Sequence, residues 1–143
     1  MAPATRVLGF TILALAALWG LQGCSGAAAR PKAEAAVVVF HDQFNADDFD
    51  SIWNSAYYQL REANSQADFV KFLQGIHRKL GQVVNTTPDG WQVGFHNYKS
   101  TVMLRQKTVF EHGTGEEEFD FYVVGDGVKL VGYHVESKEL MTL

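Results

Sequence analysis

The pattern of apolar and polar positions divides the chain into a first half with helical spacing and a second half of alternating residues. Apolar side chains recur at helical spacing within residues 33–44, 49–58 and 69–80. Residues three and four positions apart lie on the same side of a helix, so each segment presents one apolar face. The pattern therefore predicts three helices before Gly81.

Capping residues indicate where these helices begin and end. Asp47 is the expected N-cap of the second helix, because its side chain can accept hydrogen bonds from the free backbone N–H groups of the first turn. Ser65, with Asp68 three residues later, is the expected start of the third helix. Gly81 is expected to end it, since glycine readily adopts the backbone conformation that follows a last helical turn.

After Gly81 the period changes to two, which is typical of strands with one buried face. Long strands are expected at 101–111, 116–124 and 128–135, and shorter ones on either side of the turn signal Pro88-Asp89-Gly90. Gly125-Asp126-Gly127 favours a tight hairpin. The predicted fold class is α+β, with N-terminal helices packed on a curved antiparallel sheet.

An apolar run occupies the N-terminus. Val7–Leu18 follows a single basic residue, Arg6, and ends shortly before Gly23 and Cys24. A short basic start, an apolar stretch and a small residue before the cut are typical of a secretory signal. The stretch is shorter than the roughly 20 apolar residues that a membrane-spanning helix needs. Residues 1–23 are therefore predicted to be a signal peptide that is helical in its apolar part.

The only cysteine of the chain follows this run. Leu21-Gln22-Gly23-Cys24 resembles a bacterial lipobox, although Gln22 replaces the usual small or β-branched residue. The resemblance implies that Cys24 carries acyl chains such as palmitate and anchors the protein to a membrane on the periplasmic side of the cell envelope. Ser25 would favour the outer membrane of a diderm bacterium. The alternatives are an ordinary cleaved signal with an incidental cysteine and an uncleaved signal anchor.

The residues after the cysteine have no periodicity. Residues 24–32 are rich in small side chains and contain Arg30-Pro31. Such a composition favours a flexible tether, so the folded domain is expected to span 33–143.

Charge and cysteine content exclude several classes of function. The chain has 12 Lys and Arg against 16 Asp and Glu, a formal charge of -4, and no basic cluster, which argues against nucleic acid as a partner. One cysteine excludes an intramolecular disulfide framework and a multi-cysteine zinc site. The triplet Glu116–Glu118 lacks the alternating oxygen ligands of a calcium loop and is expected to be a solvated turn. We expect no metal and no cofactor.

The order of these features resembles a known superfamily. A Phe-rich first helix, an acidic break at residues 45–52 and a helix that ends in Leu80-Gly81-Gln82-Val83 precede the meander. Over about residues 34–139 this is similar to the nuclear-transport-factor-two-like superfamily, the cystatin-like α+β roll. Within it, the chain is similar to small bacterial envelope domains of unknown function. The resemblance implies helices that cover a curved sheet. Members include ketosteroid isomerase, scytalone dehydratase and non-catalytic binding modules, so the fold does not choose a function.

Two histidines, His96 and His134, lie within the expected strands. If their sheet face lines the space between sheet and helices, Tyr98, His96, His134 and Tyr122 form a possible pocket; otherwise they lie on the open face as ordinary residues. His41 and Asp42 are adjacent in a helix, where side chains point about 100° apart, so they cannot form a catalytic pair.

The first functional hypothesis is a lipid-anchored envelope protein that serves as a non-catalytic binding or assembly module with an unknown ligand. The alternative is a small-molecule isomerase, dehydratase or hydrolase that uses a histidine in the cavity between sheet and helices. A third hypothesis is a homodimer formed through the sheet face around Tyr122, because apolar residues occur on both faces of that strand.

Overall fold

The computed structural model describes residues 26–142, so the signal peptide predicted over 1–23 and the acylation predicted at Cys24 lie outside the described residues. None of the helices within 26–142 is both long enough and apolar enough to span a bilayer. The elements, in chain order, are α1 (Gly26–Asn45), α2 (Phe49–Ser55), α3 (Tyr58–Ala63), α4 (Gln66–Leu80), β1 (Val83–His96), β2 (Lys99–Phe110), β3 (Gly113–Val124), β4 (Gly127–Glu136) and α5 (Lys138–Met141).

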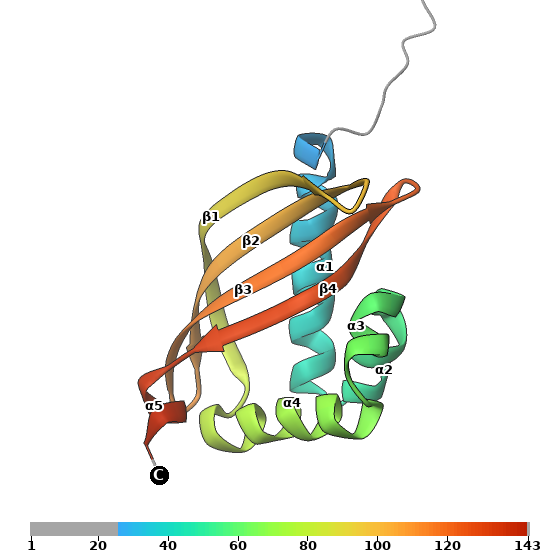
Figure 1. Cartoon of the computed structure of the whole chain (residues 1–143). Coiled ribbons are helices and arrows are strands. Elements are labelled where there is room, and N and C mark those ends of the chain that lie inside the picture. Colours follow the sequence, from blue (N-terminus) through green and yellow to red (C-terminus); the bar gives the residue numbers. More distant parts are fainter. Residues whose placement is uncertain (1–25, 143) are drawn as a thin grey trace, which may run out of the picture.

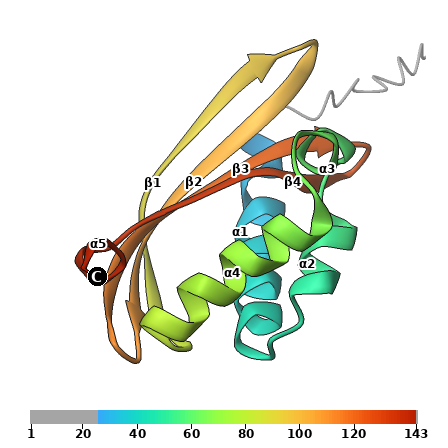
Figure 2. The same cartoon turned by 60° about the horizontal axis from the view of Figure 1, so that its bottom comes forward.

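The strands form an antiparallel meander in the order β1-β2-β3-β4. The sheet is curved, and α1, α2 and α4 lie on one side of it (Figures 1 and 2). The predicted α+β class, with N-terminal helices packed on a curved antiparallel sheet, is confirmed. Alternate residues of β2 and β3 point toward the helices, which places the core between the inner face of the sheet and the helical layer. The buried apolar residues of these two strands that point toward the helices are Val102, Leu104, Phe110, Phe119 and Phe121.

Helix α1 is longer than expected, and the flexible tether predicted over 24–32 is wrong for residues 26–32, which form its first turns. Ala29 and Ala33 are buried against the sheet, and such small side chains let a helix pack closely. Pro31 is the sixth residue of α1, just past the first turn, so its missing N–H removes one hydrogen bond of the helix. Burial of this alanine face therefore orders a segment whose composition alone favours a linker.

The helix boundaries agree closely with the capping residues, with one shift. Asp48 rather than Asp47 is the N-cap of α2, and its side chain accepts from Ser51 N at 3.2 Å. Asp47 instead takes a left-handed φ of 58°, which turns the chain after α1. Ser65 caps α4 by accepting from the backbone N–H of Asp68, and Gly81 ends α4 with a φ of 76°, as predicted.

Strand β1 continues through Pro88-Asp89-Gly90, the residues that favour a turn. Pro88 and Gly90 both pair with β2, and the register shifts between them, so Asp89 forms a bulge. Because β1 is the edge strand, the missing N–H of Pro88 interrupts no second ladder. The turn signal therefore marks a bulge inside one long strand rather than a break between two short ones.

A break at Ala56 and Tyr57 separates α2 from α3, although the sequence suggests one short helix. The Tyr57 N–H donates to the Leu130 carbonyl of β4 at 2.7 Å. Leu130 belongs to the other edge strand, which has a free backbone edge. This hydrogen bond fixes α3 against that edge.

The β1–β2 hairpin closes through Asn97 and Tyr98, whose φ angles are 48° and 61°. Positive φ at both positions is the requirement of the tight turn that suits the twist of two strands, and the usual residue at the second is glycine. Tyr98 is 95% exposed, so no packing within this domain compensates for its backbone conformation. The tip therefore keeps a large, exposed ring at a position that favours glycine.

We expect Tyr98→Gly to raise the free energy of unfolding by about 1 kcal/mol, because the left-handed conformation costs roughly that much for a residue with a Cβ. Urea denaturation of the wild type and the variant measures the difference. Lower stability of the variant would contradict this explanation of the turn.

Candidate functional site

The inner face of the sheet carries a buried carboxyl group. Glu117 lies on the same side of β3 as Phe119 and Phe121 and is 1% exposed. Its neighbours Glu116 and Glu118 point to the other face, where Glu118 pairs with Arg105. The prediction that this triplet is a solvated turn is therefore wrong for its central member, because alternation along a strand sends the middle residue inward.

Three polar groups from three different elements converge on Glu117. The Tyr133 hydroxyl of β4 donates to Oε1 at 2.7 Å, and the Thr108 hydroxyl of β2 donates to Oε2 at 2.5 Å. His41 Nε2, from α1, lies 2.8 Å from Oε2. Both carboxyl oxygens therefore have partners, as a buried carboxyl group requires. We call Glu117, His41, Tyr133 and Thr108 the Glu117 cluster.

Further polar side chains extend the Glu117 cluster toward β1. Thr86 Oγ1 lies 3.2 Å from Thr108 Oγ1 and also 3.2 Å from Gln106 Oε1, so its single proton can go to either one. Gln106 is itself buried on the inner face. The inner face thus contains a polar strip that crosses β1, β2 and β3 within an otherwise apolar layer.

Aromatic rings enclose the Glu117 cluster. The ring of Phe119 lies 5.6 Å from that of His41 and 5.1 Å from that of Tyr133, and the ring of Phe40 lies 4.7 Å from that of Tyr133. Burial among these rings, together with the charge of Glu117 and the hydrogen bond to it, raises the pKa of Tyr133 well above its ordinary value. Tyr133 therefore remains a neutral donor over the physiological range.

A carboxyl group, an imidazole and a phenol are groups that acid–base enzymes use. In the Glu117 cluster they bind one another, and both Glu117 and His41 are buried. A reacting atom would have to replace one of these hydrogen bonds to reach the carboxyl group. In this conformation the hydrogen bonds of Glu117 with His41 and Thr108 join α1 to the sheet, while Tyr133 also lines a cavity of about 410 Å³ beside α3 and α4.

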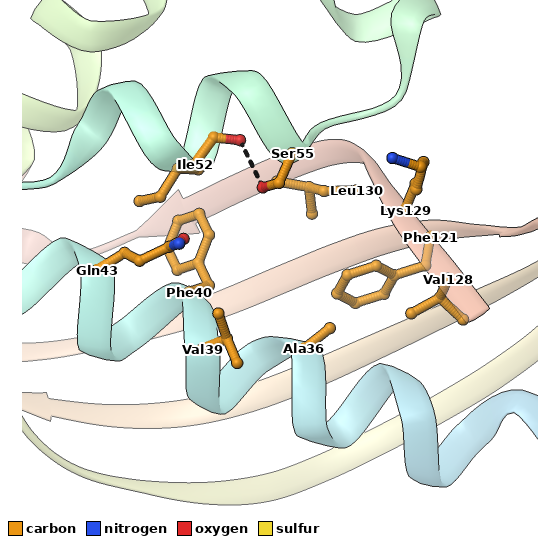
Figure 3. Close-up of a pocket in the computed structure, with 10 residues that line it drawn as sticks. All are labelled: Ala36, Val39, Phe40, Gln43, Ile52, Ser55, Phe121, Val128, Lys129 and Leu130. Atoms are coloured by element: carbon orange, nitrogen blue, oxygen red, sulfur yellow. Dashed lines mark hydrogen bonds between the residues drawn. The ribbon is translucent and has the colours of Figure 1, made fainter.

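An apolar pocket lies beside this cluster, between α1, α2 and the β3–β4 end of the sheet (Figure 3). Its volume is about 200 Å³. Phe40 separates it from the Glu117 cluster, and the Ser55 hydroxyl donates to the Ile52 carbonyl at 3.1 Å at its wall. Gln43 and Lys129 are its other polar lining residues. The apolar lining residues are Ala36, Val39, Phe40, Ile52, Phe121, Val128 and Leu130.

A second apolar surface lies on the β1–β2 hairpin. Trp91, Val93 and Phe95 share the inner face of β1, opposite the buried part of β2, yet all three are exposed. Helix α1 covers only the start of this row, where the Arg30 guanidinium lies 4.8 Å above the Trp91 ring. Figure 2 shows the hairpin extending beyond the helical layer. We call Trp91, Val93, Phe95 and the tip residue Tyr98 the hairpin surface.

The four residues predicted to line a pocket do not come together. His96 and Tyr98 are exposed at the tip of the β1–β2 hairpin, and His134 is exposed on the outer face, 3.2 Å from Glu136 Oε1. Tyr122 is buried, but on the outer face, where its ring lies 5.2 Å from that of Tyr57. The alternative interpretation of these four as ordinary sheet residues fits His96, His134 and Tyr98, whereas Tyr122 is covered by the α2–α3 junction.

The histidine between the sheet and the helices is His41. Its sequence neighbour Asp42 cannot pair with it, so the sequence did not predict a role for this residue. Its partner is Glu117, 76 positions away in sequence. Glu117 could have been found from alternation, since it has the same parity as Phe119 and Phe121. His41 could not, because nothing local indicates which strand residue faces it.

No model of a known protein family matches the chain, and no curated protein matches it. Within residues 26–142, no three His, Cys, Asp or Glu side chains are grouped so that they could hold a metal ion.

Replacing Glu117 by Gln is expected to lower the free energy of unfolding by about 2 kcal/mol, because the amide nitrogen cannot accept the hydrogen bonds that the carboxyl group accepts. Glu116→Gln is the matched control on the outer face and is expected to change it by less than about 0.5 kcal/mol. Chemical denaturation measures both. Equal effects would show that the Glu117 cluster does not stabilise the fold.

The raised pKa of Tyr133 predicts a loss of stability in alkali. Above its ordinary value of 10.0, unfolded Tyr133 loses its proton while the folded residue keeps it, so the free energy of unfolding falls as pH rises from there toward the folded pKa. Denaturation midpoints measured at about pH 8 and about pH 11 should fall more steeply for wild type than for Tyr133→Phe, which has no proton to lose there. Parallel falls would contradict the assignment.

Proposed function

We propose that this protein is a lipid-anchored module of the bacterial cell envelope that binds a partner and performs no chemistry. The observation that carries the binding role is the contrast between its two kinds of site. The Glu117 cluster is closed and its groups satisfy one another, whereas the pocket of about 200 Å³ beside it is apolar and partly open.

The size of this pocket indicates what it can hold. Pockets for whole small molecules and cofactors usually measure about 300–1,000 Å³, and this one is smaller. It suits one large apolar side chain of a partner protein, with Gln43 and Lys129 available to hydrogen-bond the partner's backbone at the rim. We therefore propose an assembly role in which a partner inserts such a side chain between α1 and β4.

Indole, the side-chain analogue of tryptophan, is a suitable probe for this proposal. In NMR titrations we expect saturable shifts of the methyl signals of Val39, Val128 and Leu130. Ala36→Leu should abolish them because it fills a pocket position, whereas Ala35→Leu should not because Ala35 is exposed. Saturable shifts that survive Ala36→Leu, or no saturable shift in wild type, would contradict the proposal.

The anchoring part of the proposal rests on the N-terminal sequence. The apolar run Val7–Leu18 and the lipobox-like Leu21–Cys24 lead directly into the domain, with only Ser25 between Cys24 and the first residue of α1. An acylated cysteine at this position holds a protein on a membrane by burying methylene groups of its acyl chains. Membership of the nuclear-transport-factor-two-like superfamily is part of the same proposal, supported by the order of helices and strands.

Cys24→Ala is expected to remove the mass gain of acylation and to shift the protein from the membrane fraction to the soluble fraction. Mass spectrometry and fractionation of cells that express the full chain measure the two effects. An unmodified wild-type protein in the soluble fraction would contradict the proposed anchor.

The enzymatic alternative, an isomerase, dehydratase or hydrolase, would have to use the Glu117 cluster, because it contains the histidine between sheet and helices. Phe40 and Phe119 pack on the Tyr133 ring and cover the cluster on the side of the apolar pocket. The hypothesis of a homodimer places Tyr122 at the contact between the two copies. Tyr122 is instead covered by Tyr57 of the same chain. Neither has the support that the open pocket gives to the binding role.

A further inference from the structure

We infer that the hairpin surface docks on the anionic lipid surface of the membrane to which Cys24 is attached. The inference rests on the proposed acylation of Cys24 and adds a second, non-covalent contact that fixes how the domain lies on the membrane. Three independent observations carry it: the position of the start of α1, the residues at the hairpin tip, and the charges around them.

The start of α1 and the tip of the β1–β2 hairpin lie at the same end of the molecule (Figure 1). The start of α1 contacts the hairpin at Trp91, six residues before the turn at Asn97, where the Arg30 guanidinium lies 4.8 Å from the centroid of the Trp91 ring. On the other side of α1, Lys32 donates to the Asp126 carbonyl in the β3–β4 turn. The N-terminal part of α1 therefore contacts both the β1–β2 hairpin and the β3–β4 hairpin.

The lengths of these segments let the anchor and the tip reach one plane. From Arg30 back to Gly26 the helix rises about 6 Å, and the two residue steps from Gly26 through Ser25 to Cys24 add at most about 7 Å. From Trp91 the strand continues for about 20 Å to the turn at Asn97. The hairpin is therefore long enough to meet the surface that holds Cys24.

The hairpin surface has the composition of a membrane-interface contact. Phe95 is 71% exposed and Tyr98 is 95% exposed, on a turn position that favours glycine. Burial of apolar and aromatic side chains at the boundary between headgroups and acyl chains is energetically favourable. Tyr is enriched there because its apolar ring can be buried while its hydroxyl stays hydrated. An exposed ring kept in a strained turn is explained by such a contact.

The charges near the hairpin tip favour binding to an anionic lipid surface. The first two turns of α1 and the residues flanking the two hairpin turns carry Arg30, Lys32, Lys99 and Lys129 against Glu34 and Asp126. Glu34 pairs with Arg30 at 2.8 Å. This end is therefore positive in a chain whose formal charge is -4. Attraction of these side chains to anionic headgroups would orient the domain with the hairpin toward the bilayer.

The test uses the full acylated chain reconstituted in vesicles that contain anionic phospholipid. A fluorophore is placed at the tip through His96→Cys, which leaves Phe95 and Tyr98 intact, and at the opposite end through Met141→Cys as the matched control. Both positions are exposed. We expect a water-soluble quencher to quench the label at 96 several-fold more slowly than the label at 141. The protection should disappear in neutral vesicles.

Two further variants test the residues involved. Adding Phe95→Ser and Tyr98→Ser should remove the protection while the protein remains in the membrane fraction, and Phe72→Ser, an exposed aromatic residue of α4, should not. Lys99→Glu should shift the docking equilibrium by about fivefold for each unit of charge changed.

The remaining outcomes separate this inference from the proposed anchor. A wild-type protein absent from the membrane fraction overturns the anchor, and the inference with it. A membrane-bound protein whose label at 96 is quenched as fast as that at 141 overturns the inference alone. Protection in detergent without lipid also overturns it, and if that protection depends on protein concentration, the occupant of the hairpin surface is a second copy of the protein.

Discussion

The burial of one carboxyl group on the inner face of the sheet constrains the rest of this structure. Glu117 can lie there only if both of its oxygens have hydrogen-bond partners, and these come from α1, β2 and β4. A register slip by one residue in β3 would exchange the buried Glu117 for a residue of the outer face. The same hydrogen bonds that satisfy the carboxyl group therefore specify the strand register and the position of α1 over the sheet.

This arrangement separates the molecule into a closed centre and two open surfaces. The Glu117 cluster holds α1 on the sheet, and the two surfaces to which we assign the proposed contacts are the apolar pocket beside Phe40 and the hairpin surface. These lie on different sides of α1: the pocket toward β3 and β4, the hairpin surface toward β1. The proposed partner contact and the proposed membrane contact therefore do not compete for the same surface.

Sequence patterns located most of the fold, and their failures have a common cause. Ser65 and Gly81 were recognised because caps are local hydrogen-bond arrangements. The prediction of a flexible tether was wrong for residues 26–32, because Ala29 is buried in the core that α1 forms with the distant strands of the sheet. The turn signal at Pro88-Asp89-Gly90 became a bulge because pairing with the whole length of β2 outweighs a local preference.

The sequence by itself determined that helices precede strands, the fold class, the apolar N-terminal run and the position of the lone cysteine, because each depends on neighbouring residues or on composition. Only the tertiary structure decided which histidine faces a carboxyl group, that Tyr122 is covered, and that the hairpin extends beyond the helices. His41 and Glu117 are 76 positions apart, and their contact depends on how α1 crosses the sheet. Such a crossing is set by packing over the whole inner face, which no local pattern encodes.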